Sequence, residues 1–241
     1  MRTIRLFSPV ELNPDTEVDL DPGAAHRLGR VMRRRPGDRI VVFNGDGRDA
    51  EAEIVALSGS TCRVRIEASV AVDTESPLVV DLVQAVAKGD KMDWLIQKAV
   101  ELGVHAIHPV LTEHGDVRLD GARAEKRRTR WQEIAVSACE QCGRARVPEV
   151  GLPRRLADWT PPKAVGLMLD PGAERALGQV EIGTAVALAI GPEGGFGSKD
   201  RAILEDAGFR AVRFGPRVLR TETAGAAALA VLQARFGDLD R

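Results

Sequence analysis

Two glycine-containing segments carry the residue types that could bind a small molecule and act on it. The first, at residues 191–196, reads GPEGGF and directly follows an apolar run at residues 184–190. The second, at residues 214–224, reads FGPRVLRTETA and leads into an alanine-rich stretch. Glycine allows a backbone to approach a ligand closely, and a buried strand that ends in a glycine turn is typical of ligand sites in α/β folds. Two such turns at one sheet edge could enclose one cofactor.

The elements that would hold these turns alternate along the second part of the chain. Apolar runs predict strands at residues 78–87, 104–111, 164–169, 184–190 and 211–214. Helical spacing predicts helices at residues 90–103, 122–142 and 199–207 and a last helix that ends near residue 236. Asp90 and Ser198 have the residue types of helix N-caps. Strands alternating with helices indicate a mostly parallel sheet covered on both faces.

The first part of the chain has a different pattern. Short apolar runs at residues 40–43, 50–57 and 62–66, with an Asn-Gly turn at 44–47, are typical of β-hairpins, and one short helix is expected at 24–32. Residues 70–77 have the polar, proline-ended composition of a linker. We therefore predict a small β-barrel or sandwich at residues 1–72 and a second domain at residues 73–241.

Several motifs, in the same order along the chain, resemble one known family. They are MRTIRLF at residues 1–7, QKAVELGV at 97–104, the residues Arg130, Trp131, Glu140, Gln141 and Arg144, GPEGGF at 191–196 and LRTETA at 219–224. Together they resemble the ribosomal RNA small subunit methyltransferase E family over nearly the whole chain. The sequence departs from the family at His114-Gly115-Asp116, where many relatives carry arginine and serine.

The resemblance implies a fold, a cofactor and a reaction. The fold is an N-terminal PUA-like barrel that docks RNA, followed by a SPOUT domain with a trefoil knot, and the knot rests on the resemblance alone because true knots are rare. The reaction is methyl transfer from S-adenosylmethionine to N3 of a uridine in 16S ribosomal RNA of the small subunit, by a homodimer formed through the C-terminal domain. The implied cofactor-binding residues are Leu169, Asp170, Ile190, Gly191, Pro192, Glu193, Gly194, Gly195, Phe196, Leu219, Arg220, Thr221, Glu222, Thr223 and Ala224.

Arg220 is the candidate catalytic residue. A guanidinium between a loop and a helix start can stabilise negative charge on an acceptor base or bind a phosphate, and the alternative is an ion pair with Glu222. Asp170 could bind a ribose hydroxyl or a ligand amine, or cap a helix, and Thr221 and Thr223 could cap the last helix or bind the ligand. Methyl transfer needs positioning rather than a metal, so no metal site is expected.

Charge is distributed unevenly around a formal net charge of −1. Residues 26–39, 121–146 and 210–220 carry net charges of +5, +4 and +4. RNA responds to such patches rather than to the average, although each cluster could also be a solvated face. We expect RNA contacts at Arg30, Arg33 and Arg34, and the resemblance adds Arg2, Arg5, Gln141 and Arg144.

Composition narrows the remaining classes of function. No apolar run is long enough for a membrane helix and no signal-peptide pattern is present, so we expect a cytoplasmic protein. Cys139 and Cys142, with no second pair downstream, favour core packing over a zinc site or a disulfide. Two other functions stay open. One is a non-catalytic RNA-binding assembly factor with the same fold, and the other is a nucleotide-binding α/β enzyme, which the absence of phosphate-loop and dinucleotide motifs disfavours.

Overall fold

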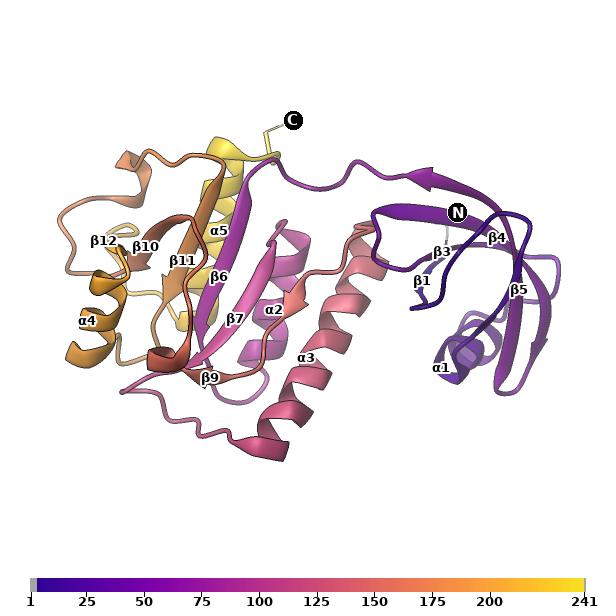
Figure 1. Cartoon of the computed structure of the whole chain (residues 1–241), viewed down its shortest axis with the longest axis horizontal. Helices are drawn as coiled ribbons and strands as arrows, with labels where there is room; N and C mark the ends of the chain where they lie inside the picture. Colours follow the sequence, from indigo (N-terminus) through magenta and orange to yellow (C-terminus); the bar gives the residue numbers. More distant parts are fainter. Residues whose placement is uncertain (1–3, 241) are drawn as a thin grey trace. The chain divides into compact units, whose positions relative to one another are not determined.

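The computed structural model describes residues 4–240, which form two compact units, each with its own sheet (Figure 1). Unit 1 comprises the chain up to residue 75 together with residues 139–147, and unit 2 comprises residues 76–138 and the chain from residue 148 onward. The sequence predicted a single domain boundary, after residue 72. It did not predict that a later segment returns to the first unit.

Unit 1 is built on a five-stranded sheet with the order β1-β3-β4-β5-β2, in which β1 and β3 are parallel and the other pairs antiparallel. Its strands are β1 (Arg5–Phe7), β2 (Glu17–Leu20), β3 (Arg39–Phe43), β4 (Arg48–Ser58) and β5 (Thr61–Ala71). The predicted hairpin is confirmed, and its turn uses positive φ at Gly45 and Gly47, which glycine adopts without strain. Because β5 continues through Ala71, the loop between the units begins later than predicted.

A short helical segment covers the core of unit 1. It consists of α1 (Pro22–His26), which the Asp21 carboxylate caps, and a π-helical turn η1 (Arg27–Val31). Alternate residues of the strands, including Val42, Ile54 and Val64, point into an apolar core that also contains Leu28. Of the basic residues 26–39, Arg27 and Arg30 therefore lie on a helical segment whose position is fixed by packing, and Arg33 and Arg34 follow it.

Unit 2 is built on a sheet in which all recorded pairs are parallel, with the order β12-β10-β11-β6-β7-β8 and β9 beside β7. Its strands are β6 (Val79–Ala85), β7 (Ala106–Leu111), β8 (Glu149–Val150), β9 (Arg154–Arg155), β10 (Val165–Leu169), β11 (Ala185–Ile190) and β12 (Arg210–Val212). Its helices are α2 (Lys91–Glu101), α3 (Gly121–Cys142, whose last residues from 139 belong to unit 1), α4 (Ser198–Asp206) and α5 (Thr221–Phe236), with 3-10 turns η2 (Leu156–Asp158) and η3 (Leu177–Gln179).

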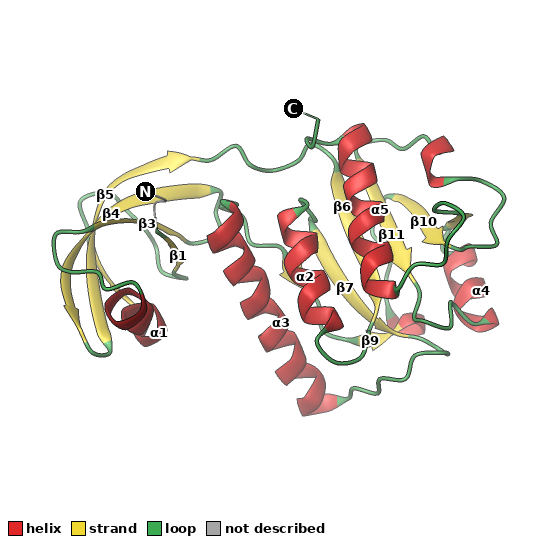
Figure 2. Cartoon of the chain, turned by 180° about the vertical axis from the view of Figure 1, so that it is seen from behind, coloured by secondary structure: helices red, strands yellow, loops and turns green. Residues whose placement is uncertain are grey.

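Both faces of the unit 2 sheet are covered, as the alternation of elements predicted. Helices α2 and α5 lie side by side over one face (Figure 2). On the other face, Val83, Ala187 and Ala189 pack with Leu156 of η2 and Leu204 of α4. Successive strand residues point to opposite faces, so the continuous apolar runs supply both layers.

Two details of the helix starts differ from the predictions. Asp90 occupies the N-cap position of α2 but its side chain makes no capping hydrogen bond, and Gly197 rather than Ser198 is the N-cap of α4. Between residues 4 and 240, no helix is long and apolar enough to cross a membrane. The trefoil knot stays a prediction.

Candidate active site

Three loops at the carboxyl ends of adjacent strands enclose a cavity of about 360 Å³ in unit 2. The loops follow β10, β11 and β12, and helices α4 and α5 complete the wall. The lining residues are 169–171, 190–196, Arg201, Phe214, 217–219, Thr221 and Ala224. Ligands of open α/β sheets bind outside the carboxyl ends of the strands, so this cavity occupies the position expected for a cofactor.

The lining contains the predicted cofactor residues except Arg220, Glu222 and Thr223. Phe214, Arg217 and Val218 belong to the predicted 214–224 segment but not to the implied cofactor-binding residues, Pro171 follows Asp170, and Arg201 lies apart from every predicted motif. Arg201 lies on α4, where one arginine among several charged residues gives no signal of a site.

The GPEGGF segment forms a tight loop that needs its glycines. The Gly195 N–H donates to the Pro192 carbonyl at 2.9 Å, and Gly195 has a φ of 70°. A Cβ at Gly191 would lie 3.1 Å from the Phe196 nitrogen, so this position cannot carry a side chain without moving the loop. Phe196 is 8% exposed and packs in the core, which anchors the far end of the loop. The backbone facing the cavity is therefore held in one shape.

Thr221 connects the two motif loops through a buried hydrogen-bond relay. Its hydroxyl donates to the Gly191 carbonyl at 2.7 Å and accepts from the Gln84 side-chain amide at 2.9 Å. Thr221 and Gln84 are 3% and 0% exposed. Because a hydroxyl has one proton to donate, Thr221 holds the glycine loop and has no donor left for a ligand.

Asp170 is held by partners inside the protein. Its carboxylate accepts from Arg201 at 2.6 Å and from the Gly172 N–H at 2.9 Å. Burial, the largest single influence, raises the pKa of Asp170, but these two hydrogen bonds and the positive charge of Arg201 together outweigh it, and the pKa lies below its ordinary value. Asp170 is thus an anion that orients Arg201 along the cavity wall.

Lys91 links the two motif loops by charge. Its ammonium lies 2.5 Å from Glu193 Oε1 in the glycine loop and 3.9 Å from Glu222 Oε2 at the start of α5. The hydrogen bond from Lys91 lowers the pKa of Glu193, and the same contact raises the pKa of Lys91. Nothing in the sequence around Lys91 singled it out, because its partners follow about a hundred and more residues later.

Arg220 is the exposed N-cap residue of α5. Within the described chain its guanidinium forms no hydrogen bond or ion pair. The alternative, an ion pair with Glu222, is therefore not formed, and Glu222 lies 3.9 Å from Lys91 instead. Thr223 is exposed as well. The Arg220 side chain is therefore available to a substrate that approaches the cavity.

The candidate RNA-binding arginines of unit 1 fall into two groups. Arg30 and Arg33 are exposed, and Arg34 is half-buried with its guanidinium 4.0 Å from Asp38. Arg5 instead pairs with Asp49 and donates to the Arg144 carbonyl at 3.1 Å. Arg144 itself is 5% exposed.

The buried Arg144 pairs with Glu75 at 2.6 Å. RNA contact by Arg5 and Arg144 is disfavoured because their charged groups are engaged inside the unit, whereas Gln141 is exposed. Arg2 lies outside the described residues.

Comparison with known proteins assigns the family. Residues 74–233 match the family described as RNA methyltransferase domain, and residues 20–67 match the RNA methyltransferase PUA domain. The chain is 32% identical to ribosomal RNA small subunit methyltransferase E of Buchnera aphidicola (Schizaphis graminum) over 99% of its own length and 98% of that protein. The chain belongs to the ribosomal RNA small subunit methyltransferase E family.

Solved structures of related proteins carry a ligand. The small subunit methyltransferase E of Neisseria gonorrhoeae, bound to S-adenosyl methionine, is 39% identical, with a TM-score of 0.92 over 98% of this chain and 99% of that one. A putative Legionella pneumophila methyltransferase, in complex with the same cofactor, is 39% identical, with a TM-score of 0.95 over 99% of this chain and 100% of that one. Each of these two similarities therefore extends over both units of this chain.

Proposed function

We propose that the protein transfers the methyl group of S-adenosylmethionine to N3 of a uridine in 16S ribosomal RNA of the small subunit. The S–CH₃ bond breaks, an N3–CH₃ bond forms, and the products are S-adenosylhomocysteine, methylated RNA and the proton that leaves N3. The observation that carries this proposal is the cavity built from both motif loops of the methyltransferase E family at the ends of adjacent strands.

The cavity fits the chemistry of this cofactor. S-adenosylmethionine has an adenine, ribose hydroxyls and an amino-acid tail, but no phosphate. Backbone groups of residues 190–196 would hydrogen-bond its polar edges, and the apolar side chains of Leu169, Val218 and Leu219 would contact the adenine. When bound, the cofactor supplies a methyl group on a sulfonium.

Arg220 would act on the acceptor. Deprotonation of uracil N3 leaves a negative charge, and an exposed guanidinium beside the cavity can stabilise it. Lys91 and Glu222 would keep the start of α5, and with it Arg220, in register with the glycine loop. An anion stabilised in this way requires no protein base.

Methyl transfer can be measured directly. Purified protein is incubated with radiolabelled S-adenosylmethionine and small subunits from a strain that lacks this gene, and the modified nucleoside is mapped by mass. We expect one methyl group on uridine N3. Incorporation of no label, with normal binding of S-adenosylhomocysteine, would favour the alternative of a non-catalytic assembly factor.

Unit 1, which contains the PUA match, would bind the RNA through Arg30, Arg33 and Arg34. Because the proposed substrate is ribosomal RNA, we place the reaction in the cytoplasm. Unit 1 would be the docking domain, and the methyltransferase domain would follow it along the chain. A barrel of this size would recognise the shape and backbone of an assembled or partly assembled small subunit.

Changing Arg30, Arg33 and Arg34 together to glutamine is expected to weaken binding to small subunits. The slope of log affinity against log salt should become shallower by about 0.7 to 0.9 for each phosphate that the variant no longer neutralises. Affinity for S-adenosylhomocysteine should not change. A filter-binding salt series measures the slope.

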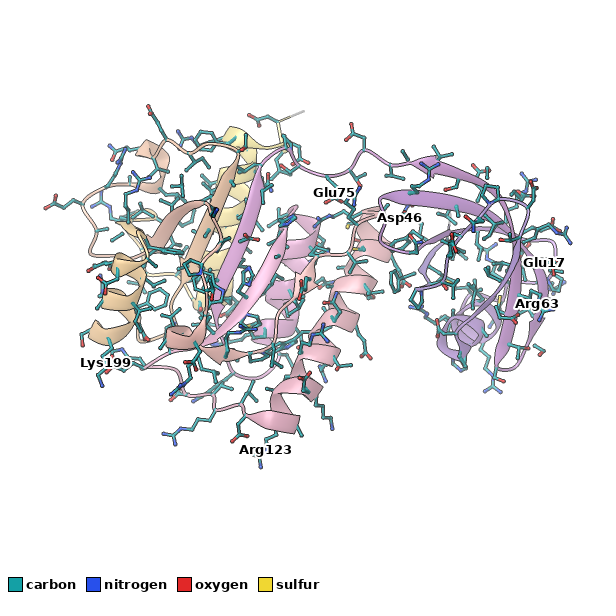
Figure 3. All side chains as sticks on the ribbon, viewed as in Figure 1. Glu17, Asp46, Arg63, Glu75, Arg123 and Lys199 are labelled. Carbon is teal, nitrogen blue, oxygen red and sulfur yellow. The ribbon has the colours of Figure 1, made fainter. Side chains whose placement is uncertain are left out.

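The matched control changes Arg39, Arg63 and Arg65, which are exposed in the same unit but pair with Glu67, Asp19 and Glu17. Arg63 and Glu17 lie near each other at the surface of the unit 1 sheet (Figure 3). Equal effects of the two triple variants would mean that net charge, rather than this cluster, binds the RNA.

We also propose a homodimer formed through unit 2. Ala226 and Ala228 of the alanine-rich helix α5 are buried within the chain, whereas Trp94 of α2 is 44% exposed and Val218 is 78% exposed. Large apolar side chains at the surface favour a partner. Light scattering at micromolar concentration should give about twice the monomer mass of 26.0 kDa, and a monomer would exclude the dimer.

A further inference from the structure

Unit 2 contains a second cavity, of about 420 Å³, which shares no lining residue with the cofactor cavity. It lies over β7, between the first half of α3 and the segment at 149–160. We propose that this cavity binds an unpaired nucleotide of the substrate RNA, away from the methylated uridine. The proposal rests on the proposed function only in that RNA supplies the nucleotide.

Trp159 gives the cavity an aromatic surface. The indole is half-buried and packs against the Phe209 ring at 6.0 Å and the His108 ring at 5.7 Å, between centroids. These contacts hold the ring in one orientation, while Trp159 still lines the cavity. A fixed aromatic ring is a stacking platform for a nucleobase of any identity.

Two arginines with no hydrogen bond or ion pair to other described residues line the cavity. In the described part of the chain, neither Arg128 of α3 nor Arg154 of β9 forms a hydrogen bond or an ion pair. Neighbouring Arg130 and Arg155 do form pairs, with Asp93 and Asp158. A guanidinium is a strong donor to phosphate oxygens, and Arg128 and Arg154 remain available for this contact.

Two carboxylates, of Glu125 and Glu149, also line the cavity and narrow the class of ligand. They would repel an inorganic anion, but they can accept hydrogen bonds from the N–H groups of a base. His108 also lines the cavity, and its Nε2 lies 3.8 Å from Asp81 Oδ1.

A nucleotide matches these groups together. Its phosphate suits the arginines, its base suits the indole face, and its N–H donors suit the carboxylates. An apolar ligand would form no hydrogen bond with the two arginines and the two carboxylates. A simple anion would contact neither the aromatic ring nor the carboxylates. The volume is within the range of about 300–1,000 Å³ found for small-molecule sites.

The test uses full-length protein saturated with S-adenosylhomocysteine, which blocks the cofactor cavity. Equilibrium dialysis measures binding of UMP, CMP, AMP and GMP. We expect at least one of them to bind, and the Arg128→Ala/Arg154→Ala variant to bind it about 10-fold or more weakly, the scale of removing charge-assisted hydrogen bonds.

The control variant is Arg123→Ala/Arg127→Ala, which removes the same charge from exposed positions of α3 outside the lining. Arg123 points away from the sheet at the beginning of this helix (Figure 3). The nucleotide affinity of this control variant should stay within about twofold of that of the unchanged protein. Trp159→Leu should also weaken binding, but Trp159 packs in the core, so the arginine variant is the primary test.

Methyl transfer provides an independent measurement. The Arg128→Ala/Arg154→Ala variant should raise the KM for small subunits about fivefold or more while kcat and the affinity for S-adenosylhomocysteine stay unchanged. The inference fails if no nucleotide binds, if both double variants bind equally, or if inorganic phosphate competes as well as the nucleotide does. Failure of the proposed function would instead appear as absent methyl transfer by the unchanged protein, with nucleotide binding intact.

Discussion

Replacing Arg220 by alanine is expected to lower the rate of methyl transfer by more than about 100-fold, the scale of removing one donor that stabilises developing charge. The guanidinium is exposed at the start of α5 and has no partner in the described chain, so its removal should not destabilise the fold. Arg220→Lys should recover little activity, because a point charge does not replace a planar fork. Single-turnover rates with saturating cofactor measure the effect.

Arg210→Ala is the matched control for this prediction. Arg210 is also exposed, but it lies at the beginning of β12, whereas the cavity lies beyond the carboxyl ends of the strands. Its rate should be close to that of the unchanged protein. If Arg220→Ala retained more than about a tenth of the activity, the residue would be a contact rather than a catalytic group.

Replacing Gly195 by valine should weaken binding of S-adenosylhomocysteine by about 30-fold or more. Left-handed backbone costs a residue with a Cβ about 1–2 kcal/mol, and a β-branched side chain is less tolerant still. Gly195 has this conformation and lines the cavity, and no atom lies within 4 Å of a Cβ placed there. The added side chain would therefore occupy space next to the ligand. Calorimetry measures the affinity.

Gly183→Val is the control for replacing a glycine by valine outside the cavity. Gly183 precedes β11, has no positive φ and has open space around its Cβ position. The midpoint of thermal unfolding of both variants shows whether unit 2 stays folded. Normal affinity in Gly195→Val would mean that the loop is only a turn and that another part of the cavity binds the cofactor.

Much of the fold was predictable from periodicity. The runs at residues 184–190 and 164–169 are apolar enough to be buried strands, and the spacing in α2 is helical over its whole length. The two-residue strands β8 and β9 were missed because two residues show no period. Their pairing with β7 is a tertiary event, which local sequence does not encode.

The candidate site was predictable only where glycine and a motif marked it. The contacts that hold it in place join residues far apart in the chain, such as Lys91 with Glu193 and Gln84 with Thr221. Each of these residues has an ordinary local context, so only the folded chain shows its partner. The cavity at Trp159 was also missed, because the sequence around Trp159 resembles a loop.

The return of residues 139–147 to unit 1 has a consequence for how the chain is made. Glu140 accepts from the Phe7 N–H and pairs with Arg27, and the Ala145 carbonyl accepts from the Gly47 N–H. N-terminal domains usually fold first as they leave the ribosome. Here the contacts of unit 1 cannot close until residue 147 has been synthesised, by which point residues 76–138 of unit 2 have also been synthesised. Completion of the first unit during translation is thus coupled to synthesis of the second.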